Sequence, residues 1–162
     1  MDDRYTIIDS PLGPLLAVGD GTVLTRLDMQ GGRRRYPIDR SWRRDDGAFG
    51  ALTEQLGEYF AGRRREFELA LAPSGSPFEQ RVWSALCEIP YGETASYGEI
   101  ARRVGAPGSA RAVGLANGRN PIVVIVPCHR VIGADGSLTG YGGGLERKRL
   151  LLDLEAGVLP LV

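Results

Sequence analysis

The sequence predicts a mixed α/β (α+β) protein in two parts, a small antiparallel sheet with one helix followed by a mostly helical part. Residues 4–29 are rich in β-forming residues, arranged in short runs that turn signals separate. Two capping boxes, each a serine followed three residues later by glutamate, predict helix starts after residues 76 and 96. The Ala-Pro-Ser-Gly segment at 72–75 has the composition of a linker. We therefore expect an N-terminal domain at 1–75 and a C-terminal domain at 76–162.

Length and composition limit the possible classes of function. A chain of 162 residues that is 43% hydrophobic can bury a sizeable core. Lys+Arg and Asp+Glu both number 20, so any nucleic-acid binding should be local rather than driven by overall charge. No stretch is long and apolar enough for a membrane span, and the charged N-terminus leads into no signal sequence. We expect a cytoplasmic protein whose two cysteines are reduced.

The N-terminal part has the pattern of a scaffold. Its predicted strands lie at residues 4–8, 14–19, 22–29 and 66–72. Apolar residues at helical spacing predict one helix at 48–61. The basic run Arg33–Arg35 lies in a polar stretch, where we interpret it as a solvated loop, with an accessory phosphate contact as the alternative. No cluster of catalytic residue types occurs in this part.

The C-terminal part begins with a helix that starts at Pro77 and stops before Pro90. Cys87 falls within its apolar stripe, so we expect a buried and inert thiol. The second capping box begins a helix that runs through Arg103. A turn of small residues follows, and Ser109 then starts a further helix at 110–117. Two helices joined by a tight glycine-containing turn form the helix-turn-helix pattern, although helical hairpins without DNA contacts share it.

The helix at 110–117 has unusually small side chains, and its only charged residue is Arg111. Such a helix can approach the floor of a DNA groove closely while one arginine makes a specific contact. The alternative is a helix that packs tightly against its neighbours through small residues. Both interpretations can hold on opposite faces.

The chain is organised around the segment 122–130. The aliphatic, mostly β-branched run at 122–126 predicts a buried strand or extended segment, and Pro127 ends it. Cys128 and His129 follow directly, and His129 is the only histidine of the protein. An apolar stretch that ends in an adjacent thiol and imidazole suggests a rigidly held reactive cysteine.

A cysteine becomes a useful nucleophile when a base or cationic surroundings favour its thiolate. Adjacent side chains of an extended segment point to opposite sides, so His129 would act on Cys128 through a water or a local turn. The candidates to orient the imidazole are Asp135, Glu146, Asp153 and Glu155. We rank Glu155 first, because an unpaired carboxylate at the apolar end of the expected last helix, 145–155, would be costly. A structural role and a Cys-His hydrolase or acyltransferase remain alternatives. One histidine and two cysteines do not supply an ordinary zinc site.

Several motifs together resemble one known family. They are Pro90-Tyr91-Gly92-Glu93-Thr94, Ser96-Tyr97-Gly98, Ala110-Arg111-Ala112-Val113-Gly114, Gly118-Arg119-Asn120-Pro121, Pro127-Cys128-His129-Arg130-Val131-Ile132, Tyr141-Gly142-Gly143-Gly144 and Leu151-Leu152-Asp153-Leu154-Glu155. At this spacing they closely resemble the O6-alkylguanine-DNA alkyltransferases. The resemblance is continuous from about Phe78 to Glu155 and weaker over residues 1–75.

The resemblance implies a DNA repair protein that removes an alkyl group from O6 of guanine, and less readily from O4 of thymine. It implies that the Cys128 thiolate attacks the alkyl carbon and is not regenerated, so each chain acts once. His129 would act as base through a water, Glu155 would orient it, and Asn120 would hold the turn that presents the segment. It implies no cofactor. Because no cysteine or histidine precedes Cys87, we also expect no metal. A lesion sensor without transfer chemistry is the competing class, although the sensor branch of the family has tryptophan in place of Cys128.

The resemblance also implies how the substrate is held. Tyr97 would lie over an extruded nucleotide and donate its hydroxyl to the base. The carbonyls of Cys128 and Val131 would accept the exocyclic amine, and the loop at Tyr141 and Gly142 would meet O6. Arg111 would fill the gap that the flipped base leaves in the duplex. The protein would bind the duplex from the minor groove, without regard to sequence. The expected DNA contacts are Ser109, Ala110, Arg111, Ala112, Gly114 and Asn117. We expect a monomer that can bind DNA cooperatively.

Overall fold

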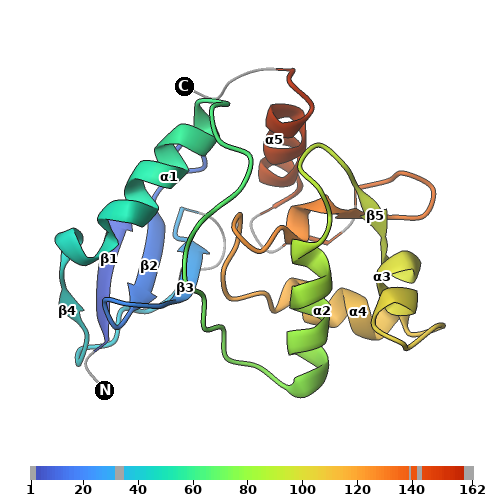
Figure 1. Cartoon of the computed structure of the whole chain (residues 1–162), viewed down its shortest axis with the longest axis horizontal. Coiled ribbons are helices and arrows are strands. Elements are labelled where there is room, and N and C mark those ends of the chain that lie inside the picture. The colour runs from blue at the N-terminus through green and yellow to red at the C-terminus, as the bar shows by residue number, and fades with distance from the viewer. Residues whose placement is uncertain (1–2, 32–34, 139, 142–143, 159–162) are drawn as a thin grey trace.

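The structure is a computed structural model that describes residues 3–31, 35–138, 140–141 and 144–158. Its N-terminal half contains a four-stranded sheet in the order β3-β2-β1-β4. The strands are β1 (Arg4–Ile8), β2 (Leu15–Gly19), β3 (Leu24–Met29) and β4 (Arg43–Arg44). β2 pairs antiparallel with both neighbours, whereas β4 runs parallel to β1. After a 3-10 turn, η1 (Asp46–Phe49), helix α1 (Gly50–Phe60) lies across one face of the sheet (Figure 1).

The C-terminal half is mostly helical, which confirms the predicted α/β class. Its helices are α2 (Pro77–Cys87), α3 (Tyr97–Arg103), α4 (Ala110–Gly118) and α5 (Leu145–Glu155). Both predicted capping boxes form, at the starts of α2 and α3. Ser109 occupies the cap position of α4, but its side chain makes no capping hydrogen bond. A short parallel pair, β5 (Ala95–Ser96) and β6 (Val131–Ile132), joins the start of α3 to the segment that follows Cys128.

The predicted strand at 66–72 is wrong. Only Leu71 pairs, in a single parallel bridge with Leu24 of β3. The preceding backbone is bound by α1 instead. The side chain of Gln55 accepts from the backbone N–H of Glu68 (2.9 Å) and donates to the carbonyl of Glu68 (3.1 Å). Both backbone groups of Glu68 are therefore satisfied by a side chain rather than by a strand partner.

The predicted strand at 122–126 is also wrong. Ile122 forms one bridge with Leu27, and the chain then turns, with Val124 in the left-handed region at φ 72°. Asn120 closes this turn, since its Oδ1 accepts from the N–H of Ile122 (3.0 Å) and its Nδ2 donates to the carbonyl of Val126 (2.8 Å). Cys128–Arg130 then form a 3-10 turn, η2, rather than extended backbone.

Cys87 is exposed, contrary to its predicted burial. The buried stripe of α2 consists of Val82, Trp83, Ala85 and Leu86. The next residue on a helix is turned by about 100°, which brings Cys87 past the edge of this stripe.

The free edge of β3 connects the two halves. The N–H of Leu27 donates to the carbonyl of Pro121 (2.8 Å), and the N–H of Val123 donates to the carbonyl of Leu27 (3.0 Å). One continuous hydrophobic core includes residues of the sheet, α1, α2 and α5. The segment that leads to Cys128 is therefore held by the N-terminal sheet. None of the helices in the described ranges is long and apolar enough to cross a membrane.

Candidate active site

Cys128 lies at the start of η2, where its side chain borders a cavity of about 220 Å³. The residue is 4% exposed. Both halves of the chain line the cavity, with Arg26, Met29 and Tyr36 on one side and Asn117, Asn120, Cys128 and Tyr141 on the other. The cavity therefore leads from the junction of the halves to the thiol.

Burial raises the pKa of the Cys128 thiol. Asn120, the charge of Lys148 and the hydroxyl of Tyr141 act in the opposite direction but do not cancel that effect. The resting cysteine is therefore a thiol at neutral pH, and a base must take its proton to form the nucleophile.

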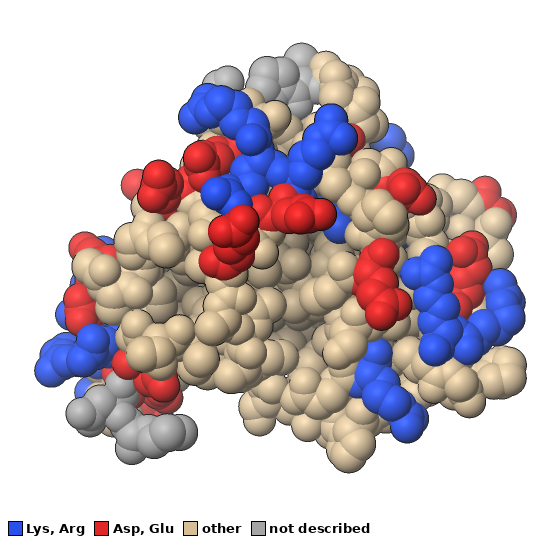
Figure 2. Space-filling model, viewed as in Figure 1, with Lys and Arg blue, Asp and Glu red and all other residues tan. Residues whose placement is uncertain are grey.

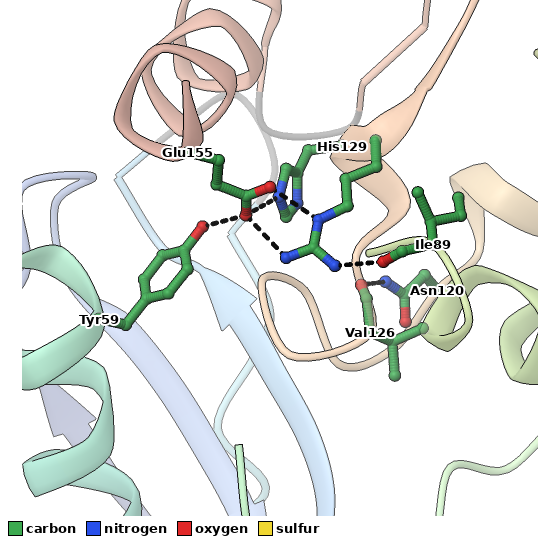
Figure 3. Close-up of polar contacts among 7 residues, drawn as sticks. Tyr59, Ile89, Asn120, Val126, His129 and Glu155 are labelled. Atoms are coloured by element: carbon green, nitrogen blue, oxygen red, sulfur yellow. Dashed lines mark hydrogen bonds and ion pairs between the residues drawn. The ribbon is translucent and has the colours of Figure 1, made fainter. Parts of the chain in front are cut away.

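His129 is fully buried beside it, and its Nε2 lies 2.7 Å from Oε2 of Glu155 (Figure 3). Burial lowers the pKa of His129 and outweighs the opposing effect of Glu155, so the imidazole is neutral near pH 7. No described residue offers a hydrogen bond to Nδ1. With Nε2 donating to Glu155, Nδ1 carries the lone pair of a base.

Glu155 is the common acceptor of the site. Its Oε1 accepts from Nε of Arg130 (2.7 Å), and its Oε2 accepts from a terminal nitrogen of Arg130 (3.0 Å) and from the hydroxyl of Tyr59 (2.6 Å). Burial alone would raise the pKa of Glu155, but the hydrogen bonds from His129 and Arg130, together with the charge of Arg130, lower it to about 2. Glu155 is therefore a fixed anion, and Figure 3 shows it between Tyr59 and His129.

Lys148 is a buried amine on the inner face of α5. It is 0% exposed, and its Nζ donates to the carbonyl of Val131 at 2.5 Å. Burial lowers the pKa of Lys148, whereas the nearby Cys128 raises it. A cation at this position favours the thiolate form of Cys128.

The two halves of the chain match two family models. Residues 4–73 match the ribonuclease-like domain of 6-O-methylguanine DNA methyltransferase, and residues 77–157 match its DNA-binding domain. This chain belongs to the 6-O-methylguanine DNA methyltransferase family. The resemblance inferred from the motifs is confirmed.

Relatives in this methyltransferase family match almost the whole chain. A methylated-DNA–protein-cysteine methyltransferase of Mycobacterium tuberculosis is 59% identical over 158 residues, 97% of this chain and 94% of that protein. Its counterpart in Methanosarcina acetivorans is 51% identical over 151 residues, 93% of this chain and 97% of that protein. A crystal structure of Mycobacterium tuberculosis OGT in complex with DNA superposes with a TM-score of 0.90 at 58% identity, covering 97% of this chain and 95% of that one.

The structure brings together most of the residues that the methyltransferase resemblance selects. Cys128, His129, Glu155 and Asn120 form one cluster with Tyr141. The ring of Tyr97 packs against α4, with ring carbons 3.8 Å from the position that a Cβ on Gly114 would occupy. Val131 is fully buried, and its carbonyl already accepts from Lys148. Gly142, like Arg33 and Arg34, lies outside the described residues.

Asn117 requires a correction, since we expected its side chain to contact DNA. It is 3% exposed, and its Nδ2 donates to the carbonyl of Cys128 (3.3 Å). Position 117 lies on the inner face of α4, whereas Arg111, Ala112 and Leu115 are exposed on the outer face. Oδ1 of Asn117 is buried and has no hydrogen-bond partner among the described residues. Asn117 also lines the cavity.

Sequence reasoning about this methyltransferase missed Tyr59, Arg130 as a partner of Glu155, and Lys148. Arg130 follows directly after His129, so its place in the motif was the available signal. Lys148 interrupts the buried face of α5, which was a weaker signal. Tyr59 resembled any other apolar residue of α1, and it is 96 residues distant from its partner.

Proposed function

We propose that this protein repairs O6-alkylguanine in double-stranded DNA, and less readily O4-alkylthymine, by moving the alkyl group to Sγ of its own Cys128. The observation that carries the proposal is the buried Cys128 thiol at the cavity wall, followed directly by His129 in contact with Glu155. The product is a thioether, which this site has no means to reverse. Each chain therefore acts once.

The transfer is a displacement at the alkyl carbon. Nδ1 of His129 receives the thiol proton through a water, while Nε2 donates to Glu155. The sulfur forms the new S–C bond as the C–O bond breaks, and the electron pair of that bond leaves with the guanine oxygen. Tyr97 donates a hydrogen bond to the leaving base and so stabilises the charge that develops there. Asn120 positions the reaction by holding the turn before Cys128.

Base recognition relies on polar groups around the cavity. The carbonyl of Val131, which accepts from Lys148, can accept a second hydrogen bond from the exocyclic amine, because a carbonyl oxygen has two lone pairs. The carbonyl of Cys128 already accepts from the N–H of Val131 and, at 3.3 Å, from Nδ2 of Asn117, so the amine would have to replace the longer of these bonds. Oδ1 of Asn117 adds a buried acceptor that no described residue satisfies. Tyr141 closes the cavity beside the thiol. The amide near Gly142 remains a predicted donor to O6.

DNA is the partner that the comparisons support, through the solved complex of the Mycobacterium tuberculosis relative with DNA. We propose that α4 enters the minor groove, with Arg111 taking the place of the flipped nucleotide. Ser109, Ala110, Ala112 and Gly114 would bring the helix backbone close to the groove. On the face in Figure 2, basic and acidic side chains are interleaved, which agrees with local rather than charge-driven binding. We further propose two domains, 1–75 and 76–162, and a cytoplasmic monomer that binds DNA cooperatively.

Counting repaired lesions tests this function. With duplex DNA that carries O6-methylguanine in excess over protein, repair should stop at one lesion per chain. Repair beyond one equivalent would contradict a self-alkylating mechanism. DNA binding without any repair would favour a lesion sensor, and sustained turnover of an ester or amide would favour a hydrolase.

Arg111→Ala should slow repair of duplex DNA by about tenfold or more, because a side chain that fills the gap offsets part of the few kcal/mol of unstacking. Reaction with free O6-benzylguanine, which needs no extrusion, should keep its rate. Arg63→Ala is the control, since Arg63 is also an exposed arginine but lies after α1 in the N-terminal half, away from α4 and the cavity. Equal slowing with free base and duplex would count against the proposed role of Arg111.

Asn117→Ala should slow reaction with free O6-methylguanine by about tenfold, since one hydrogen bond to the base contributes roughly 1 kcal/mol or somewhat more. Iodoacetamide, which alkylates the thiol without base recognition, should react at an unchanged rate in a Cys87→Ser background. An equal loss of rate with both reagents would show that Asn117 affects the reactivity of Cys128 and not the recognition of the base.

A further inference from the structure

We propose that Tyr59, a residue of the N-terminal half, is a positioning residue for alkyl transfer, because its hydroxyl holds the Glu155 oxygen that orients His129. This inference rests on the proposed function. It assigns to the N-terminal half a direct part in the reactivity of Cys128, in addition to its support of the fold.

The first argument is the geometry of Oε2 of Glu155. This one atom accepts from Nε2 of His129 (2.7 Å) and from the hydroxyl of Tyr59 (2.6 Å). Arg130 binds the carboxylate in a two-point fork. Figure 3 shows that Tyr59 reaches the carboxylate from α1. His129 and Arg130 belong to η2. The carboxylate is therefore fixed between an element of each half.

The second argument is the cost of burying a hydroxyl. Tyr59 is 0% exposed, and its ring packs in an aromatic cluster with Phe60, Phe67 and Tyr91. A phenylalanine would fill that space without a polar group that has to be satisfied. Burial raises the pKa of Tyr59 well above its ordinary value, so the hydroxyl remains protonated and donates at every working pH.

The third argument concerns the proton of His129. Donors that share Oε2 divide its negative charge, so Tyr59 moderates the pull of Glu155 on the imidazole. The charged or titratable groups around Glu155 are His129, Arg130, Tyr59, Tyr91 and Tyr141. Those around His129 are Glu155, Arg130 and Lys148. Removing only the hydroxyl of Tyr59 leaves the cations in place. The pKa of His129 should then rise, because Glu155 attracts its proton more strongly.

Tyr59→Phe tests the proposal, with Tyr91→Phe as the matched control. Tyr91 packs edge-on against Tyr59, but its hydroxyl is not a donor to Glu155 in the part of the chain that the structure describes. The rate constant for reaction with O6-benzylguanine should fall by about five- to tenfold in Tyr59→Phe and remain unchanged in Tyr91→Phe. In Tyr59→Phe, the acid limb of the pH profile of this rate constant should move to higher pH. Nuclear magnetic resonance provides a direct readout, because the ring signals of the only histidine need no assignment.

The amplitude of this one-use reaction counts folded, competent chains, whereas its rate constant reports the reactivity of each. A reduced amplitude with no change in the rate constant of the chains that react would show a merely structural role and overturn the proposal. An unchanged rate constant and an unchanged midpoint for His129 would overturn it as well. In both cases the wild type would still take up one alkyl group. A wild type that takes up none would instead overturn the proposed function.

Discussion

Cys128→Ser is expected to abolish alkyl uptake while binding to duplex DNA is retained. Serine is nearly isosteric, so η2 and the cavity should keep their shape. Its hydroxyl is a far weaker nucleophile, because it ionises much less readily than a thiol even with a base beside it. Uptake is measured with a radiolabelled O6-methylguanine duplex, and binding by a gel-shift assay with the same DNA.

The other cysteine supplies the control for this experiment. Cys87 is an exposed free thiol at the end of α2. Burial of part of its side chain raises its pKa, and neither His129 nor Glu155 contacts it. Cys87→Ser should therefore react as the wild type does. Retained uptake in Cys128→Ser, or its loss in Cys87→Ser, would mean that the acceptor has been assigned to the wrong sulfur.

Glu155→Gln is expected to slow alkyl transfer by about 10²-fold or more, the lower end of what a positioned base contributes. The neutral amide no longer stabilises the positive charge that His129 gains on accepting the thiol proton. The variant should also lose about 3–5 kcal/mol of unfolding free energy, since Arg130 is left buried without its counter-charge. Single-turnover kinetics measures the first effect and denaturant unfolding the second. Glu146→Gln, an exposed position on the same helix, should show neither effect.

The stability effect of Glu155→Gln should depend on pH with a defined sign. Because the folded protein lowers the pKa of Glu155 from 4.5 to about 2, the charged form stabilises the fold at neutral pH. This contribution is present above the ordinary pKa and is lost as the pH falls toward 2. The difference in stability between wild type and Glu155→Gln should therefore shrink across that interval. A constant difference from pH 7 to pH 2 would contradict the role of Glu155 as a buried anion.

The parts of the fold that follow from local chemistry were predictable from the sequence. The capping boxes at Ser76 and Ser96 form because serine and glutamate satisfy each other's nearest backbone groups. The turn at 122–126 was not predictable from the β-branched residues there, which favour a strand. It forms because the side chain of Asn120 binds two backbone groups. In the segment at 66–72, the side chain of Gln55 likewise satisfies both backbone groups of Glu68. Each segment thus has backbone groups bound by a side-chain amide from outside the segment, which its own residue pattern does not reveal.

The candidate site shows the same limit. Cys128, His129 and Glu155 could be selected because rare residue types stand in a specific motif, and a carboxylate at an apolar helix end needs a partner. Tyr59 could not be selected, since its role depends on which two helices meet and not on any local pattern. The inward position of Asn117 was missed because the helical face that packs inward follows from the tertiary contacts of α4.

The site of alkylation is the most direct test of the central claim that Cys128 is the acceptor. The protein is allowed to react with one equivalent of duplex DNA that carries O6-methylguanine, is then digested, and its cysteine peptides are compared by tandem mass spectrometry. We predict one additional methylene on Cys128, in proportion to the lesion removed, and none on Cys87. A methyl group on Cys87 or on another residue, or lesion loss without a modified Cys128, would contradict it.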